Sequence, residues 1–147
     1  MALLDTSIYN KVIEVGKKAF EALRNDDINN FKLYAEEAWN QFPNPKENWN
    51  QVYNYAKMVF KGFLGKKEFE EAKLWLNRMI DNNNCLHLFD SDLTFNIGKY
   101  YFETKDYLKA YEEWRSVVED AGYRYFENEK SEYLEFYNNP QKYMENA

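Results

Sequence analysis

Residues 68–76 read Glu-Phe-Glu-Glu-Ala-Lys-Leu-Trp-Leu, and residues 106–114 read Asp-Tyr-Leu-Lys-Ala-Tyr-Glu-Glu-Trp. Both stretches follow one pattern: an acidic residue, an aromatic residue, two further residues, alanine, three further residues and a large apolar residue. Stacked helical units present the same small residue to their neighbours, so such a repeat is typical of helical repeat proteins. The pattern predicts a helical scaffold and favours binding over catalysis.

The composition around these stretches also indicates helices. The chain has 147 residues, enough for one domain with its own core, and it contains only 5 Gly and 3 Pro. A sheet of many strands needs more turn residues than this. We therefore expect a single all-α domain over residues 1–147.

Apolar residues recur every three or four positions along most of the chain, as the buried face of a helix requires. The spacing predicts an irregular first hairpin over 5–42, a second over 45–82, a third over 91–121 and a C-terminal capping helix over 124–138. Asn44, Pro45 and Glu47 resemble a helix start, so the third helix is expected to begin near Pro45. The polar residues 81–84 are expected to form a loop, and the apolar residues 85–89 to cover a neighbouring seam.

The sequence contains few residue patterns that would indicate catalysis, metal binding or cofactor binding. The single cysteine, Cys85, has only His87 nearby, and burial as a filler explains this pair better than a nucleophile and its base. We therefore expect no enzyme, no metal site and no cofactor.

No stretch is apolar enough to span a bilayer, and one cysteine suits a reducing compartment, so we expect a cytoplasmic protein without membrane contact.

Negative charge is concentrated near the C-terminus. Residues 103–147 contain 6 basic and 11 acidic residues, a net charge of −5, whereas residues 1–102 contain 13 basic and 14 acidic residues, a net charge of −1. Such a field repels nucleic acid and attracts a basic protein. The acidic residues could equally serve only to keep the protein in solution, so both explanations, partner attraction and solubility, remain open. We expect another protein as the partner and no nucleic acid.

Around residues 94–117 the chain resembles the tetratricopeptide repeat, a unit of two helices. The matching positions are Thr94, Ile97, Gly98, Tyr101, Tyr107, Ala110, Trp114 and Val117. A weaker unit is formed by Val59, Phe63, Phe69, Ala72, Leu76 and Met79, and a degenerate one by Ile28, Phe31, Ala35, Ala38 and Pro43. The resemblance implies a right-handed α-α superhelix of about three degenerate hairpins plus the capping helix. In it, small Gly98 and Ala110 let paired helices approach closely.

In that family the first helix of each unit lines a concave groove. The resemblance therefore implies a partner-binding groove with Asn54, Lys57, Lys61, Asp92, Phe95, Lys99 and Phe102. Its lysines would suit an acidic peptide, although solvation of the groove explains them equally well.

A second candidate surface is the acidic, aromatic C-terminal end, with Tyr125, Glu127, Glu129, Glu132, Tyr133 and Tyr137. These residues either bind a basic partner or cap the apolar end of the stack. Over residues 39–137, ending in the stretch from Gly122 to Tyr133, the arrangement looks like small bacterial tetratricopeptide-like proteins, which often act as immunity proteins of polymorphic or contact-dependent toxins. This resemblance implies neutralisation of a basic toxin domain. The alternative is a general adaptor that holds a peptide in the groove.

Overall fold

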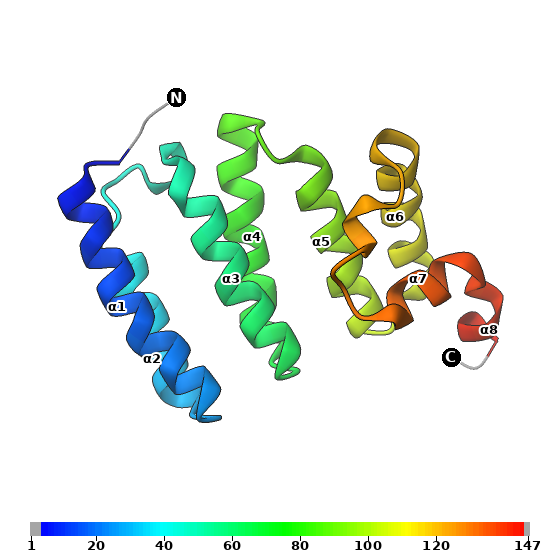
Figure 1. Ribbon diagram of the computed structural model, residues 1–147, viewed down its shortest axis with the longest axis horizontal. Coiled ribbons are helices and arrows are strands. Elements are labelled where there is room, and N and C mark those ends of the chain that lie inside the picture. The colour runs from blue at the N-terminus through cyan, green and yellow to red at the C-terminus, as the bar shows by residue number, and fades with distance from the viewer. Residues whose placement is uncertain (1–3, 146–147) are drawn as a thin grey trace.

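The computed structural model describes residues 4–145, and these residues are arranged in helices and short connections without a β-strand. The long helices pack as three adjacent pairs: α1 (Thr6–Arg24) with α2 (Ile28–Trp39), α3 (Asn50–Gly65) with α4 (Phe69–Leu86), and α5 (Asp90–Glu103) with α6 (Tyr107–Ala121). The pairs stand beside one another in a row along the long axis of the molecule (Figure 1). The predicted all-α fold of paired helices is confirmed.

The same turn closes all three hairpins. Asp26, Lys67 and Lys105 each lie two residues before the second helix and adopt a positive φ, of 58°, 60° and 67°. In each turn the next residue donates its backbone N–H to a carbonyl five positions earlier, at 2.8–2.9 Å. This is the left-handed helix ending known as the Schellman motif. Its recurrence shows that the three hairpins are built on one plan.

The acidic residue that follows each turn begins the second helix. Asp27 and Asp106 accept a backbone N–H from three residues further on, at 3.2 Å and 3.4 Å, and so cap α2 and α6. Glu68 holds the same position before α4 but makes no side-chain cap bond. The acidic residue of the repeated sequence pattern is therefore a helix start.

Two apolar clusters make up the core, and α5 contributes to both. Leu93, Ile97 and Tyr100 of α5 pack against the cluster formed by the first two hairpins. Phe95 and Phe102, also on α5, belong to a second cluster with α6 and the C-terminal residues. Helix α5 is therefore covered on two sides, unlike a helix that lines an open groove.

Within the third hairpin, α5 and α6 approach closely at Gly98. A Cβ atom added there would lie 2.3 Å from Nε1 of Trp114, which is fully buried. That indole N–H donates a hydrogen bond to the Phe95 carbonyl at 3.0 Å. The absence of a side chain at Gly98 is thus what admits the indole between the two helices.

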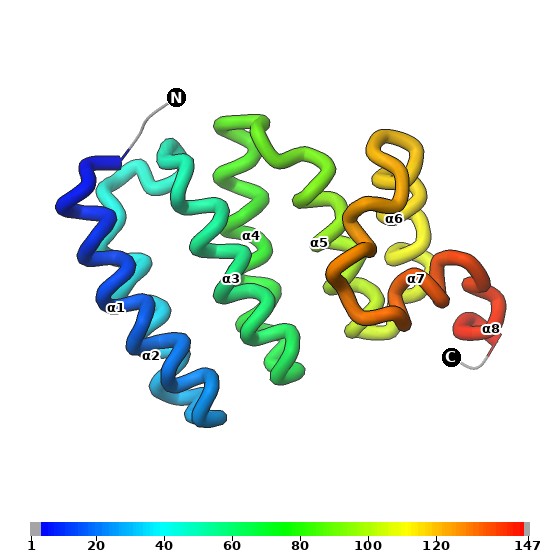
Figure 2. Tube along the Cα trace, viewed as in Figure 1, coloured from blue at the N-terminus to red at the C-terminus, as the bar shows by residue number. Residues whose placement is uncertain are grey.

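The C-terminal segment, defined here as residues 123–145, folds back across α5 and α6 (Figure 2). It contains the 3-10 turn η2 (Arg124–Phe126), α7 (Ser131–Asn138) and α8 (Pro140–Met144). The prediction of one continuous helix over 124–138 is wrong, because residues 127–130 break the helix and Lys130 is extended, with ψ 142°. Glu129 and Lys130 form ion pairs with α5 at this break, and these contacts replace a helical turn.

The expected start of the third helix near Pro45 is also wrong. A short 3-10 turn, η1 (Lys46–Asn48), comes first, Trp49 is extended, and α3 begins at Asn50. The side-chain amide of Asn82 donates to the Glu47 and Trp49 carbonyls, at 3.0 Å and 2.9 Å. These two bonds hold the linker against α4 in a non-helical form.

Residues 81–84 are helical, contrary to the loop prediction, and α4 continues to Leu86. Asn82 and Asn83 are buried, and the side-chain Oδ1 of Asn83 accepts the Phe89 backbone N–H at 2.9 Å. In residues 85–89 only the Phe89 ring covers a seam, stacked on Tyr53 at 4.1 Å, whereas Cys85 and His87 are exposed. The expected burial of the Cys85 and His87 pair is therefore wrong.

Candidate functional site

Residues of α1 and α3 line an apolar groove of about 290 Å³. Ile13 on α1 and Met58 on α3 are exposed there, at 40% and 53%. The floor contains Val12, Gly16 and Tyr55, and the groove is completed by Tyr9, Lys17, Phe20, Arg24 and Asn54. We call this feature the apolar groove.

Sequence reasoning missed most of the apolar groove. Of the predicted site residues only Asn54 lines it. A signal was present: Ile13 and Met58 are large apolar residues that fall outside the buried stripes of their helices. Apolar side chains left over from the core in this way are candidates for a binding surface.

The predicted groove residues on α5 are not open to a partner. Phe95, Lys99 and Phe102 are only 2–4% exposed. The C-terminal segment covers them: the Phe126 ring lies 5.1 Å from Phe95, and the Tyr133 ring lies 5.2 Å from Phe102. The expectation that these residues line an open groove is wrong, because the chain itself occupies that space.

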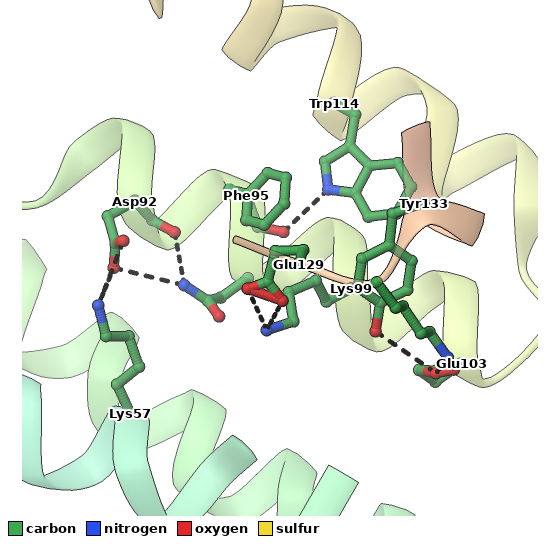
Figure 3. A network of polar contacts seen from close by, with 10 residues as sticks. Lys57, Asp92, Phe95, Lys99, Glu103, Trp114, Glu129 and Tyr133 are labelled. Carbon is green, nitrogen blue, oxygen red and sulfur yellow. Dashed lines mark hydrogen bonds and ion pairs between the residues drawn. The ribbon is translucent and has the colours of Figure 1, made fainter. Parts of the chain in front are cut away.

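Lys57 and Asp92 come together in a polar network that joins α3 to α5 (Figure 3). Lys57 Nζ lies 3.2 Å from Asp92 Oδ2, and the Tyr53 hydroxyl donates to the same oxygen at 2.5 Å. Asn96 also donates to Asp92, at 3.3 Å. Burial and the nearby carboxylate raise the pKa of Tyr53, so the phenol stays protonated and remains a donor. These contacts fix the second hairpin against the third.

A second part of the network fixes the C-terminal segment to α5 (Figure 3). Lys99 Nζ lies 2.9 Å from Glu129 Oε1, and Lys130 Nζ lies 2.8 Å from Glu103 Oε1. Burial lowers the pKa of Lys99, while the hydrogen bond and charge of Glu129 act in the opposite direction. A buried ammonium needs such a partner, so Glu129 has a structural role.

Some side chains of the acidic aromatic end pack inside the protein, and others face solvent. Glu129 and Tyr133 point inward, as described above. Tyr125 stacks on Phe95 at 5.7 Å, and Tyr137 stacks on Tyr111 at 5.3 Å. Glu127 and Glu132 are exposed. The six predicted residues therefore do not form one outward surface, and only these two carboxylates are open to solvent.

Lys61 and Asn54 on α3 are exposed, and Lys57 is half-buried. The role of these three residues in partner binding stays a prediction.

Over residues 4–145 no three His, Cys, Asp or Glu side chains are grouped in a way that would hold a metal ion. None of the helices in that range has both the length and the apolar character to cross a membrane.

Comparisons of the chain with protein-family models, with curated proteins and with solved structures found no match.

Proposed function

We propose that this protein works by binding another polypeptide, without catalysing a reaction on it. The apolar groove is the observation that carries the proposal. Ile13 of α1 and Met58 of α3 both line it and are exposed, whereas other apolar residues of these two helices are packed in the core. Hydrophobic surface of this kind, concave and bordered by polar residues, is typical of interaction sites.

The charges near the groove indicate what the partner carries. Lys17 and Arg24 lie in the lining of the groove, and Lys57 and Lys61 of α3 line a further cavity. Lys57 is already paired with Asp92, whereas Lys61 is exposed. We therefore propose a partner segment with an apolar side chain for the groove and acidic residues beside it.

A double variant, Ile13→Glu with Met58→Glu, tests the groove. It places two carboxylates where the apolar side chain of the partner is expected, so we predict a loss of affinity of about 100-fold. The measurement is capture from the source-cell lysate with immobilised protein, followed by titration of the captured partner. Both side chains are substantially exposed, so the helical circular dichroism signal should not change.

Leu33→Glu is the matched control. Leu33 lies on α2, is 59% exposed, and is outside the groove lining. It should leave capture unchanged. Equal binding by the wild type and the double variant would exclude the apolar groove as the contact surface.

The second candidate is neutralisation of a basic toxin domain by an immunity protein in the bacterial cytoplasm. It is supported by the net charge of −5 over residues 103–147, with Glu127 and Glu132 exposed in the C-terminal segment. A relation to the tetratricopeptide family is part of this proposal. The three identical turns and the contact between Gly98 and Trp114 support it.

For this second candidate, Glu127→Lys with Glu132→Lys should weaken capture of a basic partner about tenfold at low salt and less at high salt. Glu21→Lys with Glu37→Lys changes the net charge by the same amount on α1 and α2 and serves as the control. An equal effect of both pairs would mean that only the total charge matters. Retained affinity in both pairs would remove the electrostatic argument for this surface.

A further inference from the structure

A second cavity, of about 400 Å³, lies between the C-terminal end of α3, the end of α5 and residues 128–133. Four lysines line it: Lys61, Lys67, Lys99 and Lys130. They come from three separate parts of the chain, which the fold brings around one space. We call this feature the lysine cavity.

The lysine cavity has an excess of positive charge. Lys99 is paired with Glu129 and Lys130 with Glu103, and both glutamates also line the cavity. Lys61 and Lys67 have no ion pair among residues 4–145. The four lysines and two glutamates leave a net charge of +2 in a chain whose total charge is −6. The excess is therefore local and is opposite in sign to the rest of the protein.

One of the four ammonium groups is almost removed from solvent. Lys99 is 4% exposed, and its pKa is lowered first by burial and further by the nearby Lys61 and Lys57. Lys61 and Lys57 therefore repel the Lys99 ammonium, while the hydrogen bond and charge of Glu129 favour it. An anion in the cavity would relieve this repulsion.

We propose that the lysine cavity binds a phosphate monoester. Such a group carries about two negative charges near neutral pH on one compact centre, which matches the excess of +2. Lysine ammonium groups bind phosphate as point charges, and four of them surround this space. The phosphate belongs either to a small metabolite or to a phosphorylated residue of a partner. The site does not depend on the apolar groove.

The test is a titration of isotope-labelled protein with inorganic phosphate and with a short phosphoserine peptide, followed by NMR at constant ionic strength. We expect saturable shifts at residues 61–67 and 128–130. Succinate carries the same charge on two separated carboxylates and should bind at least tenfold more weakly. A peptide that binds tenfold more tightly than inorganic phosphate would identify a partner residue as the source, and equal affinities a free metabolite.

The variant Lys61→Gln with Lys67→Gln removes the two unpaired charges and should weaken phosphate binding at least tenfold. Both side chains are exposed, so the fold should tolerate the change. Lys11→Gln with Lys18→Gln removes two exposed lysines of α1 and should have no effect. The proposal is overturned if no phosphate probe gives saturable shifts, if Lys61→Gln with Lys67→Gln binds as the wild type does, or if succinate binds as tightly as phosphate.

Discussion

Phe136→Ala is expected to lower the free energy of unfolding by about 3–5 kcal/mol, a large part of the stability of a domain this size. The Phe136 ring is fully buried and lies 5.2 Å from Phe102, 5.6 Å from Tyr107 and 5.9 Å from Trp114. Together with Tyr133, it anchors α7 on the third hairpin. Its loss leaves a cavity that the rigid neighbouring rings cannot fill.

Urea denaturation followed by circular dichroism measures this loss, and hydrogen exchange locates it. Exchange should accelerate first in α7 and then in α5, because α7 covers that helix. Tyr123→Ala is the control, since Tyr123 is 53% exposed and the change should cost little. Stability close to that of the wild type in Phe136→Ala would contradict the account of α7 as part of the core.

Gly98→Ala is expected to cost about 3 kcal/mol, although alanine is the better helix former. The new methyl group would overlap the Trp114 indole, which is held by its hydrogen bond to Phe95 and by packed rings on several sides. Helices α5 and α6 would have to separate to relieve the overlap. The measurement is the midpoint and slope of urea denaturation, with near-ultraviolet circular dichroism to follow the indole.

Gly65→Ala is the matched control for this prediction. Apart from its chain neighbours and the adjacent backbone of its own helix, no atom lies within 4 Å of a Cβ placed there, so the substitution should be neutral or slightly stabilising. A Gly98→Ala protein as stable as the Gly65→Ala protein would show that the indole moves at little cost, and that close approach does not explain the glycine.

The repeat of the hairpins could be predicted because it depends on short patterns of neighbouring residues. An acidic residue precedes each second helix, followed by an aromatic residue in α4 and α6, and the structure places Asp27, Glu68 and Asp106 at equivalent helix starts. Helix capping depends on a few neighbouring residues, so a sequence pattern records it directly. The positive φ of the three turn residues could not be predicted in this way, because none of them is glycine.

Residues 81–84 show why the helix boundaries were harder to predict. Three asparagines in a row favour a loop by their own preferences. In the structure, however, the side-chain amide of Asn82 binds the linker before α3, and that of Asn83 binds the backbone of Phe89 before α5. These bonds exist only in the folded protein, and they outweigh the local preference.

The site was the least predictable part. The resemblance to the tetratricopeptide repeat implied that the first helix of each pair faces a groove, and Phe95, Lys99 and Phe102 were predicted as binding residues on that basis. It could not indicate that the C-terminal segment returns to cover them, because an aromatic, acidic stretch packs equally well on several apolar faces. In the structure, an open apolar groove lies at α1 and α3 instead.

Site-specific photo-crosslinking tests the proposed binding surface most directly. A photoreactive residue is placed at Ile13, at Met58 or at Leu33, and the protein is irradiated with its captured partner. We predict crosslinks from Ile13 and Met58, which line the apolar groove, and none from Leu33. Crosslinks from Leu33 with none from the two groove positions would contradict the proposal.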